Sequence, residues 1–124
     1  MEKITSLNVK RTTPWIVRDG DGKRYELDFN RDSVVRAEEQ GFTLKVISEM
    51  KDGKVASVWS RLFYFSFYRY PEISNAETNE ILFNCLRQAD REKIIFGLLD
   101  MFTDTYDSLF EDSEQSKNSK WSVE

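Results

Sequence analysis

The residues of this chain that could do chemistry are mainly carboxylates, because the sequence contains no histidine and one cysteine, Cys85. Without histidine the commonest general base and the commonest zinc ligand are missing, and one cysteine cannot complete a Cys/His metal cluster. A histidine-dependent serine hydrolase is therefore excluded. Cys85 lies in an apolar stretch, which is typical of a buried small hydrophobic residue in a reducing compartment.

The segment Asp19-Gly20-Asp21-Gly22 is the nearest approach to a metal-binding loop. An EF-hand would need a further oxygen ligand where Lys23 stands and a glycine where Arg24 stands. The Asp-Gly pairs are typical of a tight hairpin turn instead. Two facing carboxylates could hydrolyse a glycoside, but the acids here follow expected polar faces. We expect no metal, no cofactor and no enzymatic activity.

Length and charge narrow the classes of partner. The 124 residues suit one domain and carry a formal net charge of −4, with Lys and Arg scattered among the acids. A nucleic-acid groove needs a basic stripe, so we expect no nucleic-acid partner. No apolar run approaches the roughly 20 residues that span a bilayer, and the first residues lack a signal-peptide pattern. We therefore expect no membrane contact and a cytoplasmic protein.

The expected elements predict an α+β fold, in which an N-terminal β-hairpin packs against a mainly helical part. The hairpin and the helices together form one domain over residues 1–112. The hairpin covers about residues 13–29. Apolar and acidic residues alternate from Tyr25 to Phe29, so one face of this arm should meet a core and the other should meet water.

Four helices are expected, over about residues 31–40, 55–70, 74–88 and 90–111. Asn30 is placed to cap the first helix, and Gly41 supplies a left-handed residue to end it. Ser74 and Glu77 form a capping box before the third helix, and Asp90 can cap the fourth. Between the first two helices, residues 42–50 fit either a strand or a helical turn, with a slight preference for the turn or a loop.

The helix expected over residues 55–70 is dense with aromatic side chains. Its apolar side is broad, so it should be a central helix with Leu62 and Phe63 in the core, while Tyr64 and Tyr68 fall on its other side. Beyond the last helix, the polar sequence of residues 113–124 predicts a flexible tail. Trp121 in this tail either docks back on the domain or anchors a partner.

Five segments, taken in order, carry a resemblance to a known family. They are Tyr25-Glu26-Leu27-Asp28-Phe29, Arg36-Ala37-Glu38-Glu39-Gln40-Gly41, Leu62-Phe63-Tyr64-Phe65-Ser66-Phe67, Tyr70-Pro71 and Lys120-Trp121-Ser122-Val123. Over nearly its whole length the chain resembles the tail assembly chaperones of long-tailed, siphovirus-like phages and prophages of Gram-positive bacteria. Members of that family are non-enzymatic.

This resemblance implies two partners, the tape-measure protein, which the chaperone keeps soluble, and the major tail protein of the tail tube. It places the protein in the bacterial host cytoplasm and not in the mature virion. The implied partner-binding residues are Tyr64 and Tyr68 on the aromatic helix, and Trp121 and Val123 in the tail. Homo-oligomerisation, the client's identity and a frameshifted extended form stay open.

Two other classes of function fit a small acidic α+β domain. One is a structural virion or neck component, which would be found in purified particles, unlike an assembly chaperone. The other is a small acidic chaperone for a secreted bacterial protein, which gene neighbourhood would distinguish.

Overall fold

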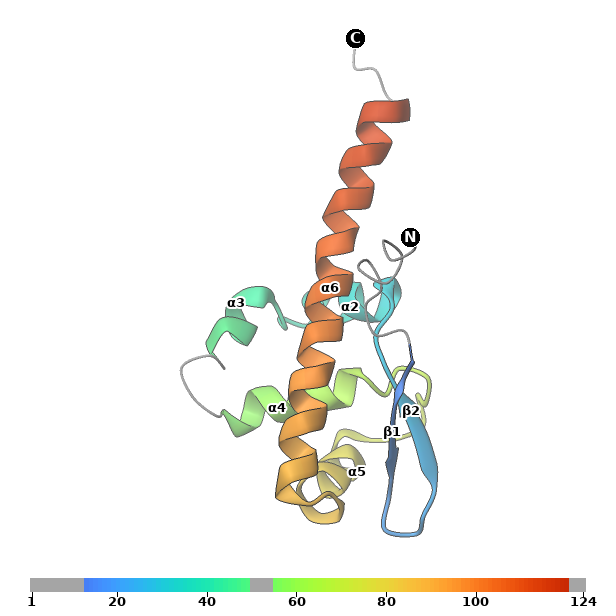
Figure 1. Cartoon of the computed structure of the whole chain (residues 1–124), viewed down its shortest axis with the longest axis vertical. Helices are drawn as coiled ribbons and strands as arrows, with labels where there is room; N and C mark the ends of the chain where they lie inside the picture. Colours follow the sequence, from blue (N-terminus) through green and yellow to red (C-terminus); the bar gives the residue numbers. More distant parts are fainter. Residues whose placement is uncertain (1–12, 50–54, 121–124) are drawn as a thin grey trace, which may run out of the picture.

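The computed structural model describes residues 13–49 and 55–120, and side chains as far as residue 110. Its elements follow in the order β1 (Trp15–Arg18), β2 (Arg24–Leu27), α2 (Arg31–Glu39), α3 (Leu44–Ser48), α4 (Ala56–Phe65), α5 (Asn75–Glu80), the π-helical turn η2 (Ile81–Cys85) and α6 (Gln88–Lys120). The predicted α+β fold, a hairpin followed by a mainly helical domain, is confirmed (Figure 1).

The hairpin forms as its sequence predicts. β1 and β2 pair antiparallel, with Val17 opposite Tyr25. The carboxylate of Asp19 closes the turn by accepting the backbone N–H groups of Asp21 and Lys23, each at 2.9 Å. Gly22 takes the positive φ of 85° that such a turn requires. The Asp-Gly segment therefore has a structural role in the turn.

One face of β2 is buried as predicted, but the acidic face differs from the prediction. Tyr25, Leu27 and Phe29 lie in the core. Asp28, which was expected to face water, is also buried, because Arg69 forms a bidentate ion pair with its carboxylate. A pattern of alternation in one strand carries no information about a distant arginine.

The helix after the hairpin has the predicted ends. Asn30 and Ser33 form a reciprocal capping box at the start of α2, and Gly41 follows its end with a φ of 90°. Within residues 42–50, which the sequence left open, α3 is a short helix capped by Thr43. Residue 50 lies outside the described residues.

The aromatic helix is shorter than predicted. α4 ends at Phe65, not near Tyr70, and a series of tight turns follows. The buried Ser66 hydroxyl donates to the carbonyl of Phe63, and the N–H of Phe67 donates to the carbonyl of Tyr64 only three residues back. These bonds tighten the end of the helix, as short-range bonds commonly do at helix ends.

The next two helix boundaries also need correction. The predicted helix over 74–88 begins with the Ser74–Glu77 capping box, but it becomes a π-helical turn and ends at Cys85. The Arg91 guanidinium accounts for this end, since it donates to the carbonyls of Leu82, Phe83 and Leu86. α6 then starts at Gln88, so Asp90 lies in its first turn and does not cap it.

The last helix is longer than predicted, since α6 reaches Lys120 and not Glu111. No glycine or proline follows Gly97 in the sequence, so no strong helix breaker stands in this stretch. The end of the predicted tail, residues 121–124, lies outside the described residues. Figure 1 shows α6 crossing the other elements and projecting beyond them at its C-terminal end.

One cluster of buried side chains joins the hairpin to the helices around α6. Leu62 and Phe63 are fully buried, as their positions on α4 predict, and Phe102 of α6 packs edge-on against Phe29 and Phe42. Cys85 is half-buried rather than buried. Among the described residues, no helix is both long and apolar enough to cross a membrane.

Candidate partner-binding site

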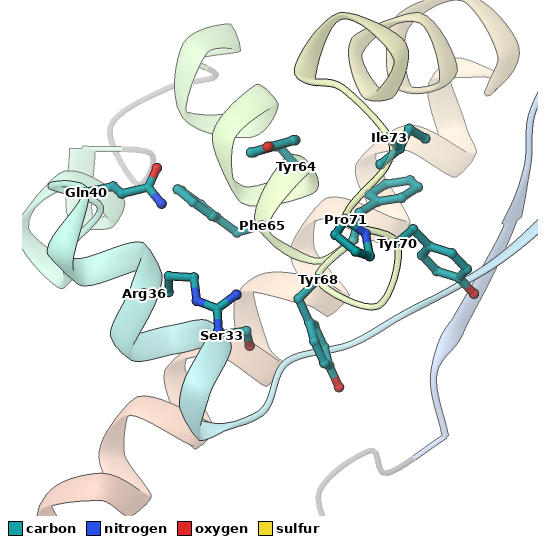
Figure 2. Close-up of a pocket in the computed structure, with 10 residues that line it drawn as sticks. Ser33, Arg36, Gln40, Tyr64, Phe65, Tyr68, Tyr70, Pro71 and Ile73 are labelled. Atoms are coloured by element: carbon teal, nitrogen blue, oxygen red, sulfur yellow. The ribbon is translucent and has the colours of Figure 1, made fainter.

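A cavity of about 180 Å³ lies between α2 and the turns that follow α4, and we call it the α2–α4 cavity. Its lining comes from two separate parts of the chain. It consists of Ser33, Arg36, Gln40, Tyr64, Phe65, Phe67, Tyr68, Tyr70, Pro71 and Ile73 (Figure 2). Most of the lining residues are aromatic or apolar, and the polar residues Ser33, Arg36 and Gln40 come from α2 and its C-cap.

The turns after α4 are fixed to the hairpin by Tyr70. Its hydroxyl accepts the backbone N–H of Glu26 at 2.8 Å, and its ring packs edge-on against Tyr25. Phe67 is buried beside Tyr25 and Phe63. Because both ends of this wall are anchored in the core, the cavity has a preformed shape.

The Tyr68 hydroxyl lies beside the ion pair between Asp28 and Arg69. Burial raises the pKa of Tyr68, and its hydrogen bond to the Asp28 carboxylate raises that pKa further. Arg69 holds the same carboxylate through two bonds, of 3.2 Å from Nε and 2.8 Å from Nη2. That pairing also raises the pKa of Arg69. The charge of Asp28 is therefore already balanced within the domain.

The opposite wall, from α2, is fixed less completely. Arg61 of α4 donates to the carbonyl of Gln40 at 2.8 Å and lies over the Phe42 ring, which ties the end of α2 to α4. Arg36 lies on the exposed side of α2 and has no ion pair with the other residues that the structure describes. Its guanidinium is available to a ligand.

Comparison with known protein families identifies the family of the chain. A family model described as a domain of unknown function, DUF5055, matches residues 15–124. The chain belongs to the DUF5055 family. No curated protein and no solved structure matches it. The matched region of this DUF5055 domain begins with Trp15, the first residue of β1, and includes every residue that lines the α2–α4 cavity.

The DUF5055 domain brings together two of the four partner-binding residues predicted from the sequence. Tyr64 and Tyr68 are half-buried and both line the cavity, although Tyr68 lies beyond the end of α4. Trp121 and Val123 lie outside the described residues. Their predicted role stays a prediction.

Sequence reasoning missed the residues of α2 and the bend that complete the cavity. Arg36, Gln40 and Pro71 appear in the segments that carry the family resemblance or beside them, but no residue pattern links them to Tyr64. The one available signal was an arginine on the polar side of a short capped helix, which usually means solvent exposure.

The cavity's chemistry suits binding. The lining has a guanidinium, an amide, hydroxyls and rings, with no histidine, cysteine or carboxylate. Among the described residues, no group of three or more potential His, Cys, Asp or Glu ligands lies close enough to hold a metal ion. A concave site that combines aromatic side chains with a few polar groups is typical of side-chain or small-ligand recognition.

Proposed function

We propose that this DUF5055 protein is a non-enzymatic phage tail assembly chaperone, which binds the tape-measure protein and recruits tail-tube subunits in the cytoplasm of the bacterial host. The observation that carries the proposal is the α2–α4 cavity, whose aromatic wall includes Tyr64 and Tyr68. The family resemblance of the five sequence segments supports it independently.

The cavity would receive an apolar side chain from a client helix. Helix-in-groove recognition inserts side chains spaced three or four residues apart, and one such side chain needs one preformed hollow. Further apolar contact could come from α6, where Phe96 is 45% and Phe110 is 57% exposed. Figure 1 shows that the backbone of α6 continues past the other elements.

Co-expression with the tape-measure protein of the same genome tests the proposal. The wild-type chain should co-purify with that client, and the double variant Tyr64→Ala, Tyr68→Ala should recover about tenfold less of it, since aromatic side chains that fill or line a binding site are common hot spots. Phe83→Ala is the matched control, because Phe83 is 38% exposed and lies outside the cavity. Circular dichroism should show that all three proteins fold.

Two results would contradict the proposal. Failure of the wild-type chain to co-purify with the tape-measure protein removes its central claim. Detection of the chain in purified phage particles would favour the structural virion or neck component, because an assembly chaperone leaves the finished tail.

A further inference from the structure

The size of the α2–α4 cavity limits what can enter it. A cavity of about 150 Å³ lined by apolar side chains can hold a benzene ring. The α2–α4 cavity measures about 180 Å³. It therefore has room for one aromatic ring or one branched aliphatic side chain.

The charged residue in the lining is basic, although the chain as a whole is acidic with a net charge of −4. No Asp or Glu is among the lining residues, whereas Arg36 is. The carboxylate that contacts the lining through Tyr68 belongs to Asp28, and Arg69 already neutralises it. The charged group of the lining is the Arg36 guanidinium, and Asp32 and Glu39 lie within about one turn of it on α2.

The Arg36 guanidinium and the apolar wall of the cavity lie close enough for one ligand to contact both. Figure 2 shows its side chain extending from α2 towards the turn that carries Tyr68 and Pro71. A ligand whose ring enters the cavity would therefore bring any adjacent group close to this guanidinium. Arginine binds carboxylates through parallel N–H···O bonds, which are stronger than neutral hydrogen bonds.

We infer that the α2–α4 cavity selects a protein side chain that is aromatic or branched aliphatic and has a carboxylate beside it. On a helical client this corresponds to Phe or Leu with Asp or Glu one turn away, because residues three or four apart lie on the same helix face. The inference rests on the proposed function for the nature of the partner. The preference for an apolar side chain with a carboxylate beside it follows from the residues that line the cavity.

A small probe tests this preference on the isolated full-length protein. N-acetyl-phenylalanine carries a ring and a carboxylate, and N-acetyl-phenylalanine amide carries the ring alone. In a titration followed by NMR, the acid should bind with a Kd on the order of 1 mM, as a ligand of this size allows. The amide should bind about fivefold more weakly, since Arg36 is exposed and its ion pair is screened by water.

Two variants test whether the preference for the acid over the amide comes from the Arg36 guanidinium. Arg36→Gln should weaken binding of the acid about fivefold and leave binding of the amide unchanged, because only the charge is lost. Arg87→Gln is the matched control, since the Arg87 side chain is 86% exposed and lies outside the cavity. It should leave both affinities unchanged.

Several outcomes would overturn the inference. They are equal affinity for acid and amide, a preference that survives Arg36→Gln, shifts that avoid Tyr64 and Tyr68, and tighter binding of adenosine monophosphate, which would indicate a nucleotide. Because the titration contains no tape-measure protein, its failure is distinct from failure of the proposed function. Selective binding of the acid without co-purification of the client would support the cavity's preference and contradict the proposed chaperone function.

Discussion

The contact between the hairpin and α6 and the α2–α4 cavity show opposite kinds of packing in one small domain. At the first, Gly97 of α6 lies directly against the Trp15 ring. A Cβ atom on Gly97 would come within 2.6 Å of Trp15 Cε2 and 2.7 Å of Nε1. At the second, the walls leave a hollow of about 180 Å³.

The difference separates what holds this fold together from what it offers to a partner. Close packing leaves no space for a ligand, and it makes stability sensitive to single methyl groups. The side chains around a preformed hollow lack some van der Waals contacts, so they contribute less to stability. They can make such contacts with a partner instead. Substitutions at the first site should therefore change stability, and substitutions at the second should change binding.

The largest expected effect comes from Phe63→Ala, which tests the core that supports the cavity wall. Phe63 is fully buried, and its ring centroid lies 5.0 Å from that of Phe67 in the wall. Its loss should lower the free energy of unfolding by about 3–5 kcal/mol, measured by urea denaturation. Phe83→Ala, at a ring that is 38% exposed, should cost much less. Equal losses of unfolding free energy for the two variants would mean that the packing of Phe63 against Phe67 does not support this wall.

The next effect is that of Gly97→Ala, which decides whether the contact at Trp15 is as tight as its geometry indicates. Alanine in a helix is favoured over glycine by about 1 kcal/mol, so propensity alone predicts a more stable protein. Overpacking against a rigid ring costs about 1–3 kcal/mol, so we expect net destabilisation. Thermal and urea melts measure the sign.

A double-mutant cycle isolates the cause of that loss. In a Trp15→Ala background the ring is absent, and Gly97→Ala should then stabilise the protein through helix propensity. Destabilisation of similar size in both backgrounds would show that Trp15 is not responsible.

The parts of the fold that the sequence could predict are those decided by neighbouring residues. The Asp-Gly turn, the Asn30 and Ser74 caps and the left-handed Gly41 each depend on groups within a few positions, and all are confirmed. The early end of α4 could not be predicted, because a helix and a series of tight turns use the same residue types.

The cavity was beyond prediction for a different reason. Its walls come from α2 and from the end of α4 with the turns after it, and these parts are separated in the sequence by α3 and most of α4. Tyr64 and Tyr68 were identified because they fall on one side of a predicted helix. Arg36 was not, because nothing in one sequence says that α2 will lie opposite them.

The smallest expected effect concerns Tyr68→Phe, which tests whether the cavity wall is shielded from water. The substitution removes the hydroxyl whose interaction with Asp28 contributes to the raised pKa of Tyr68, while Arg69 keeps that carboxylate paired. Near neutral pH the cost should be about 1 kcal/mol or less, as for a single hydrogen bond.

The pH dependence separates shielding from simple loss of that bond. Burial, and next the Asp28 bond, raise the pKa of Tyr68 above its ordinary value of 10.0, so the folded protein holds this proton more firmly than the unfolded chain. The resulting stability is complete below about pH 10 and is lost as pH rises through the folded pKa. The variant lacks this loss, whereas Tyr25 and Tyr106, whose pKa values are also raised, affect both proteins alike. Urea melts from pH 8 to pH 11 should therefore show the wild-type advantage shrinking above pH 10, and a constant difference across that range would mean that water reaches the hydroxyl freely.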